Sequence, residues 1–159
     1  MGVGKTSVAR HLAELLQCSR QDLDILIEKE FQCSVAELID TRGETEYRRI
    51  ESDMLRQTVE HSAATILSLG GGTWARAENR EVIRGAGLTA VWLESTFDHC
   101  WKNIRASKKE RPLARSKDSA MRLFEERQNT YCLADWHFVI RPGQSSYDVA
   151  LHIAEEIFS

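Results

Sequence analysis

The sequence predicts an α/β fold in which a parallel sheet is sandwiched by helices. Short apolar runs that suit buried strands alternate with longer segments of helical periodicity. This alternation is typical of parallel sheets that are covered on both faces. The length of 159 residues suits a single domain, so we expect residues 1–159 to share one core.

The helices of the first half follow from apolar spacing and from capping residues. The first begins a few residues into the chain, because Val8 and Leu12 recur at helical spacing. A short helix is expected from about Ile25, and Ser34 opens the next one with a capping-box pattern. Residues 44–59 indicate a longer, highly charged helix.

The expected strands are the apolar runs at 63–69, 88–93 and 136–140. Further helices are expected over 78–84, 96–105, 119–134 and 146–158. Three glycines, at 70–72, follow the first run and suit a tight turn. Because ligands of parallel sheets bind at the carboxyl ends of the strands, the triple glycine and the loop after 88–93 should face one crevice, together with Lys5.

The start of the chain carries a phosphate-binding signature. Gly4-Lys5-Thr6 matches the end of the pattern GxxxxGK(S/T), whose backbone N–H groups surround phosphates. In that pattern the lysine reaches the β- and γ-phosphates, and the threonine hydroxyl holds Mg²⁺. The loop residues expected at a nucleotide are Gly2, Val3, Gly4, Lys5, Thr6 and Ser7. The first glycine of the pattern, and the strand that leads into such loops, would fall upstream of Met1.

Two other interpretations of this segment are open. It could be a flexible, glycine-containing start without a ligand. A myristoylation pattern, M-G-x-x-x-(S/T), also fits Gly2 with Thr6, but it leaves Gly4 and Lys5 unexplained.

Composition narrows the class of partner. The net charge is −3, so neither nucleic acid nor a membrane surface is expected. The four cysteines have no C-x-x-C spacing, which argues against zinc and favours reduced thiols. No apolar run approaches the roughly 18 residues of a membrane span, and no signal peptide is visible, so we expect a cytoplasmic protein.

Acidic residues follow the first helix at a spacing that suits a site. Asp22 and Asp24 lie two apart, and in extended backbone both would point to the same side. One could serve Mg²⁺ through water, and the other could hold a substrate hydroxyl. An acidic turn that caps the next helix explains the same spacing.

Three arginines are candidates for binding anions. Arg48 offers a planar fork that fits a carboxylate, although a solvated helix face with Glu–Arg pairs explains it too. Arg111 lies in the polar stretch 105–118, which has six basic and two acidic residues and could be a mobile lid or a solvated basic loop. Arg127, on the helix behind that stretch, could grip an anion together with Arg48 or be a surface arginine.

The ordered set of short motifs resembles the shikimate kinase family over nearly the whole chain. The set is GKT, DLD, GETEYRRIE, GGG, RPLA and ERQNTY-x-x-A-D, in this order. The resemblance implies a small P-loop kinase with a parallel sheet and a mobile lid at about 105–118, in which the strand preceding the phosphate loop is central. It implies transfer of the γ-phosphoryl group of ATP to the 3-hydroxyl of shikimate, with Mg²⁺, in a monomer.

The resemblance also implies roles for single residues. Lys5 and Thr6 would serve ATP and Mg²⁺, with Asp22 near the metal. Asp24 would bind the substrate hydroxyls and act as a base, and Arg111 would be the catalytic arginine of the lid. The substrate residues implied, besides Asp24, are Arg48 and Arg127 on the carboxylate and Gly71 and Gly72 against the ring.

Two alternatives stay open. The nearest is a related P-loop kinase of another polyol acid, such as gluconate. A nucleotide-binding module without catalysis belongs to a different class, and the shortened phosphate pattern favours it. The complete set of Asp24, Arg48, Arg111 and Arg127 argues against such a module.

Overall fold

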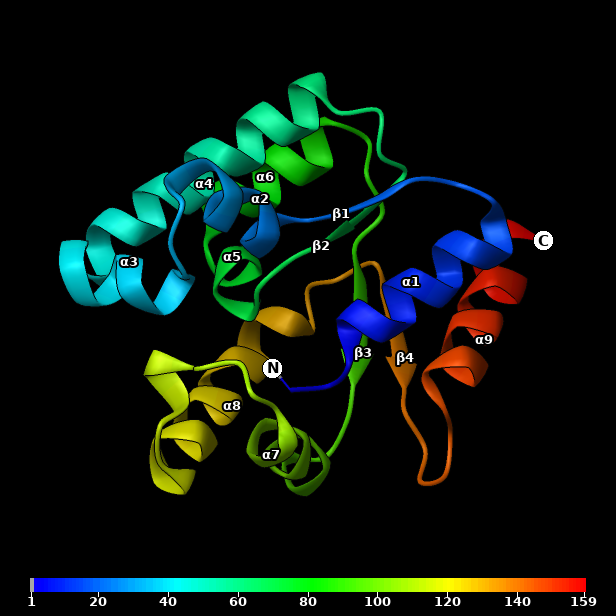
Figure 1. The fold of residues 1–159 in the computed structure, drawn as a ribbon. Coiled ribbons are helices and arrows are strands. Elements are labelled where there is room, and N and C mark those ends of the chain that lie inside the picture. The colour runs from blue at the N-terminus through cyan, green and yellow to red at the C-terminus, as the bar shows by residue number, and fades with distance from the viewer. Residues whose placement is uncertain (1) are drawn as a thin grey trace.

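The computed structural model describes residues 2–159 and has the expected α/β character (Figure 1). Met1, with which the phosphate-binding segment starts, lies outside the described residues. In chain order the elements are α1 (Lys5–Leu16), β1 (Arg20–Asp22), α2 (Leu23–Phe31), α3 (Val35–Arg42), α4 (Glu44–His61), β2 (Ile66–Ser68), α5 (Gly71–Ala75), α6 (Ala77–Gly85), β3 (Val91–Glu94), α7 (Phe97–Ala106), the 3₁₀ turn η1 (Pro112–Ala114), α8 (Lys117–Tyr131), β4 (Trp136–Val139) and α9 (Ser146–Phe158). Among these residues, none of the helices combines the length and the apolarity that a membrane crossing requires.

The strands form parallel pairs, as predicted. Within residues 2–159, β1 pairs with β2 and β3 pairs with β4, each in a two-stranded sheet. Asp22 at the end of β1 lies opposite Ser68 at the end of β2, so the carboxyl ends of both strands meet at one edge. The apolar runs had not revealed β1, because its three residues, Arg20 to Asp22, are polar.

Local sequence explains where the helices begin. The Ser34 hydroxyl accepts from the N–H of Glu37 at 3.1 Å, and the Glu37 carboxylate accepts from the N–H of Ser34 at 2.7 Å, which confirms the predicted capping box. The last helix has the same device, built from Ser145 and Asp148. These caps satisfy N–H groups that the helices themselves leave without partners.

Separate apolar clusters fix the helices around the site. One cluster centres on Leu23, Ile27 and Leu55, which are fully buried, and holds α2 against α4. A second packs α1 on α9, and Figure 1 shows these two helices side by side along the β3–β4 pair. A third cluster, around Phe97 and Ala120, joins α7 to α8 and supports the segment between them.

A cavity of about 570 Å³ lies between the two strand pairs, and the triple glycine is part of its lining. Leu67 and Leu69 line it from the β2 side, and Ala90 and Trp92 line it from the β3 side. It is also lined by Lys5 and the triple glycine, as predicted, and by Asp24, Arg48, Arg111 and Arg127. Asp22 and the loop after 88–93, which were expected at the same crevice, are not among its lining residues.

Candidate active site

The phosphate-loop residues lie at the start of α1, as predicted. Lys5 and Thr6 are its first two residues, and Gly4 caps it with a φ of 90°, a left-handed conformation that glycine adopts without strain. The free N–H groups and the dipole at this end favour an anion. Burial lowers the pKa of Lys5, although Asp24 and Asp22 act in the opposite direction.

Gly2 lets the loop pass directly over α7. Its φ is 64°, and a Cβ atom there would lie 2.6 Å from the carbonyl oxygen of Cys100. The Nδ2 of Asn103 donates to the carbonyl oxygen of Gly2 at 2.8 Å. The loop is therefore fastened to α7 at a position where no larger residue fits.

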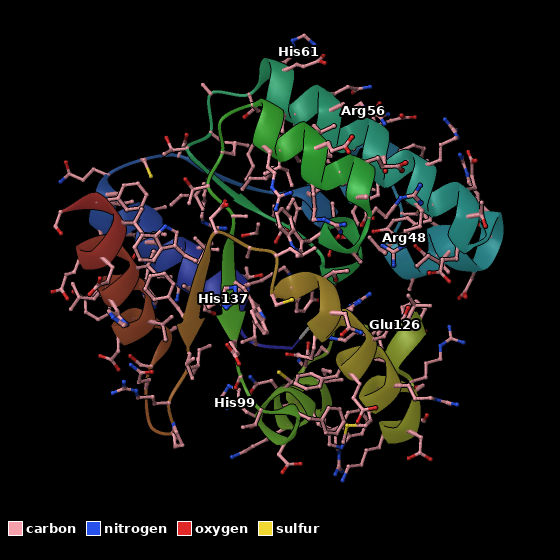
Figure 2. All side chains as sticks on the ribbon, turned by 180° about the vertical axis from the view of Figure 1, so that it is seen from behind. Arg48, Arg56, His61, His99, Glu126 and His137 are labelled. Atoms are coloured by element: carbon pink, nitrogen blue, oxygen red, sulfur yellow. The ribbon has the colours of Figure 1, made fainter. Side chains whose placement is uncertain are left out.

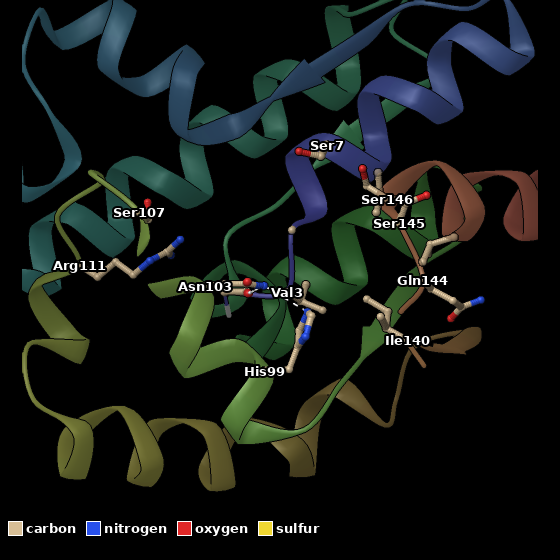
Figure 3. A pocket seen from close by; sticks show the side chains of 14 residues that line it. Val3, Ser7, His99, Asn103, Ser107, Arg111, Ile140, Gln144, Ser145 and Ser146 are labelled. Atoms are coloured by element: carbon tan, nitrogen blue, oxygen red, sulfur yellow. Dashed lines mark hydrogen bonds between the residues drawn. The ribbon is translucent and has the colours of Figure 1, made fainter. Parts of the chain in front are cut away.

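A second cavity, of about 360 Å³, lies beside this loop (Figure 3). Side chains of several elements meet there, namely Ser7, His99, Asn103, Arg111, Gln144 and Ser146. Its volume and its few polar groups are typical of a small-molecule site. Sequence reasoning missed Asn103 and Gln144, since a lone amide on a helix or in a turn forms no distinctive pattern.

The Asp-Leu-Asp segment is not extended throughout, and of the two interpretations left open by the sequence the structure has the acidic turn that caps the next helix. Asp22 ends β1, and its Oδ1 accepts from the N–H of Asp24 at 3.0 Å, which makes Asp22 the cap of α2. Asp24 is already the second residue of that helix. A carboxylate at the first position before a helix stabilises the N–H groups of its first turn, whereas it gains little by continuing a short polar strand. This local preference starts α2 directly after Asp22.

Asp24 faces the larger cavity and is surrounded by cations. Lys109, from the stretch between α7 and α8, donates from Nζ to Oδ2 of Asp24 at 2.8 Å. Burial pushes the pKa of Asp24 upward, but Lys109, and then Lys5 and Arg111, hold it below its usual value. The carboxylate is therefore kept ionised in spite of its burial.

Arg48 is oriented by a carboxylate that the sequence interpretation did not single out. Its Nη1 donates to Oε1 of Glu51 at 2.8 Å, and the Tyr47 hydroxyl donates to Oε2 of the same residue at 3.2 Å. The side chains of Arg48 and Glu51 are only 14% and 1% exposed. Figure 2 shows Arg48 on the inner side of α4, whereas His61 points outward at the far end of that helix.

The electrostatics of this network agree with its geometry. Burial pulls the pKa of Arg48 down, but the Glu51 carboxylate, with smaller effects of Tyr47 and Glu44, raises it overall. Burial, and then Glu51, raise the pKa of Tyr47 well above its usual value, so its hydroxyl stays a donor. A helix face with Glu–Arg pairs looks solvated in sequence, and only the tertiary structure shows which pair is buried.

The glycines at 70–72 give room to side chains of the protein itself. The turn expected after the apolar run connects β2 to the short helix α5, of which Gly71 and Gly72 are already the first two residues. A Cβ at Gly72 would come within 2.3 Å of the Arg48 guanidinium, and one at Gly71 within 2.7 Å of Nη1 of Arg127. The absence of side chains at α5 thus lets Arg48 and Arg127 approach the same backbone segment from α4 and α8.

The cavity has more positive than negative groups without a partner. Within residues 2–159, neither Lys5, Arg111 nor Arg127 forms an ion pair. The Nε of Arg111 is buried and has no hydrogen-bond partner in the described part of the chain. Burial lowers the pKa of Arg111, and the nearby charge of Arg127 adds to this effect. Partly buried cations without an acidic partner favour the binding of an anionic ligand.

Comparison with known proteins agrees with this geometry. The model of the shikimate kinase family, described as "SKI: Shikimate kinase", matches residues 1–158. The chain belongs to the shikimate kinase family. It is 32% identical to the shikimate kinase of Flavobacterium johnsoniae over 118 residues, which are 74% of this chain and 69% of the relative. It is 37% identical to that of Lactococcus lactis subsp. cremoris over 134 residues, 84% and 78% of the two chains.

A solved structure of the family supports the fold. Shikimate kinase from Acinetobacter baumannii, in complex with shikimate, aligns with a TM-score of 0.84 at 29% identity. The alignment covers 98% of this chain and 87% of that one. The resemblance that the ordered motifs indicated is therefore confirmed at the level of family and fold.

Proposed function

We propose that this chain is an ATP-dependent shikimate kinase, which transfers the γ-phosphoryl group of ATP to the 3-hydroxyl of shikimate. One observation carries the proposal. The unpaired cations Lys5, Arg111 and Arg127 line the same cavity as the buried carboxylate of Asp24. A polyphosphate and a carboxylated polyol together would supply the negative charge and the hydroxyl groups that such a site lacks.

The substrate half of the site suits a small acid that carries hydroxyl groups. Arg48 and Arg127 meet at Gly71 and Gly72, and their planar forks match a carboxylate. Asp24 offers an acceptor to the hydroxyl that attacks the phosphorus. The two glycines would let the ring of shikimate lie close to the backbone. The relative from Acinetobacter baumannii has been solved with shikimate, in agreement with this assignment.

The nucleotide half suits ATP. The loop of Gly2, Val3 and Gly4 and the start of α1, with Lys5, Thr6 and Ser7, would receive the phosphates. The 360 Å³ cavity next to this loop would receive the rest of the nucleotide. Asn103 and Gln144 supply amide groups there, which suit the hydrogen-bonding edge of a base.

The donor set near the loop also fits Mg²⁺. Thr6 offers a hydroxyl in the first turn of α1, and Asp22 uses only Oδ1 for its cap, so Oδ2 would be left as an acceptor for a water of the ion. Mg²⁺ keeps several waters and needs few protein ligands when phosphates take part. When bound, it would neutralise charge on the phosphates of ATP.

The residues would have different roles in the phosphoryl transfer. The hydroxyl oxygen of shikimate forms a bond to the γ-phosphorus, while the bond from that phosphorus to the bridging oxygen of ADP breaks. Asp24 takes the hydroxyl proton, and Lys5 and Arg111 stabilise the charge on the transferred group. Because all these groups come from one chain, we infer that a monomer suffices for activity. We further propose that the enzyme acts in the cytoplasm.

The test measures ADP release with ATP and Mg²⁺ in the presence of shikimate or of gluconate. We expect turnover that depends on shikimate, and formation of shikimate 3-phosphate. Faster turnover with gluconate would instead assign the chain to the alternative polyol acid. Binding of ATP without turnover of either acid would indicate a module that has lost catalysis, and the proposal would be wrong.

A further inference from the structure

The stretch 105–118, called the lid below, contacts the rest of the protein through a cation inside the proposed substrate site. Nζ of Lys109 lies 2.8 Å from Oδ2 of Asp24, across 85 residues of sequence. The lid also reaches Asp40 of α3 through Arg115, at 3.3 Å. The first ion pair lies within the site, whereas both members of the second are more than half exposed on the surface.

Lys109 occupies the acceptor that the proposed reaction needs. The Asp24 side chain is only 13% exposed, and the ammonium group of Lys109 donates to its Oδ2. The other charged or titratable groups near Asp24 come from four elements: Lys5 of α1, Asp22 at the start of α2, Tyr47 and Glu51 of α4, and Arg111 of the lid. Within the described residues, none of these groups forms an ion pair with Asp24, and Lys109 is its only ion-pair partner.

We propose that Lys109 is a positioning residue that holds the lid over Asp24 in the free protein and competes with the substrate hydroxyl for this carboxylate. This inference rests on the proposed function. Substrate would bind by displacing the ammonium group, so the lid gives up one partner when it gains contacts to phosphate. A long, half-exposed lysine suits this exchange, because its ion pair is weak enough to break.

The test compares three lid variants, Lys109→Gln, Lys109→Arg and Arg115→Gln, with the wild type. Amide hydrogen exchange of residues 105–118 without ligand reports how firmly the lid is held. Calorimetric titration with shikimate reports the competition. For Lys109→Gln we expect faster exchange and a Kd for shikimate that falls about two- to fivefold, the range of a half-exposed ion pair. Lys109→Arg, which keeps the charge, should restore most of the wild-type behaviour.

Arg115→Gln is the matched control, since it removes the other ion pair of the lid without touching Asp24. It should speed exchange without lowering the Kd. In steady-state kinetics, Lys109→Gln should lower the KM for shikimate and leave kcat within about twofold. High salt should speed lid exchange in the wild type more than in Lys109→Gln, because salt screens this pair.

A purely structural lysine would give a different result, since its loss would speed exchange and raise the Kd together. That outcome, or exchange in Lys109→Gln equal to that of the wild type, overturns the inference. If the wild type neither binds nor phosphorylates shikimate, the proposed function fails. Lid exchange in Lys109→Gln and its salt dependence then still decide whether the lysine holds the lid.

Discussion

Replacing Glu51 by Gln should separate the structural and functional roles of the buried network in α4. The carboxylate is fully buried and accepts from Nη1 of Arg48 and from the Tyr47 hydroxyl. A glutamine keeps the shape and one acceptor oxygen, so one of the two hydrogen bonds and the full negative charge are lost. A hydrogen bond to a charged group contributes about 1.5–3 kcal/mol, and Arg48 would then be a poorly compensated buried cation.

We therefore expect the free energy of unfolding to fall by about 2–3 kcal/mol, of which Glu44 recovers only a little because it lies 3.7 Å from Arg48 and is half exposed. For a chain of this length that loss corresponds to a melting temperature lower by roughly 4–12 °C. Urea unfolding followed by circular dichroism measures it. Binding of shikimate should weaken as well, because Arg48 would lose the partner that fixes its fork beside Gly72.

Asp53→Asn on the same helix is the matched control. Asp53 is also paired with arginines, Arg49 and Arg56, but all three side chains are substantially exposed. Exposed ion pairs contribute about 0–1 kcal/mol, so this variant should stay within that range of the wild type. If Glu51→Gln is no less stable than Asp53→Asn, then the buried pair does not stabilise the fold and the reasoning about Arg48 is refuted.

Three further predictions concern the site. Gly71→Ala should weaken shikimate binding at least about tenfold, since its Cβ would displace Nη1 of Arg127 and the Tyr131 hydroxyl. Gly85→Ala, which has open space around it, should leave binding unchanged, and calorimetric titration of both variants measures the difference. Asp24→Asn should lower kcat by roughly 10²-fold or more with an unchanged circular dichroism spectrum, and near-normal turnover would remove Asp24 from the mechanism. Arg127→Ala should weaken shikimate binding by about 2–3 kcal/mol with ATP binding nearly unchanged, and equal losses for both ligands would contradict its place at the carboxylate.

Sequence reasoning located the elements whose signals are local. The Ser34 capping box and the helix over 146–158 are set by residues a few positions apart, and both are confirmed. The strand pair β1–β2 depends on contacts between residues 20–22 and 66–68, and the polar residues of β1 carry no strand pattern of their own. Such a strand forms because its partner is there, and propensity alone does not reveal it.

At the site, too, the sequence alone did not reveal residues whose role depends on tertiary contacts. GKT and the arginines were visible as patterns, but Glu51 was not singled out in the charged helix. Its spacing of four residues from both Tyr47 and Leu55, which Asp53 does not share, was the available signal. What separates them is the face of α4 on which each lies, because packing on α2 and α5 buries one carboxylate and leaves the other exposed. Burial then converts an ordinary i,i+3 pair into the group that orients a binding arginine.

The glycines at 71 and 72 are a local sequence feature that results from contacts with residues far away in the sequence. Gly71 and Gly72 have no left-handed backbone, so turn geometry does not demand glycine at either position. The demand comes from Arg48, Arg127 and Tyr131, which approach from α4 and α8 and fill the volume that Cβ atoms would need. Two arginines can converge on one backbone segment only where that segment has no side chains. The glycines at 71 and 72 are thus better explained by the close approach of side chains from α4 and α8 than by a flexible turn.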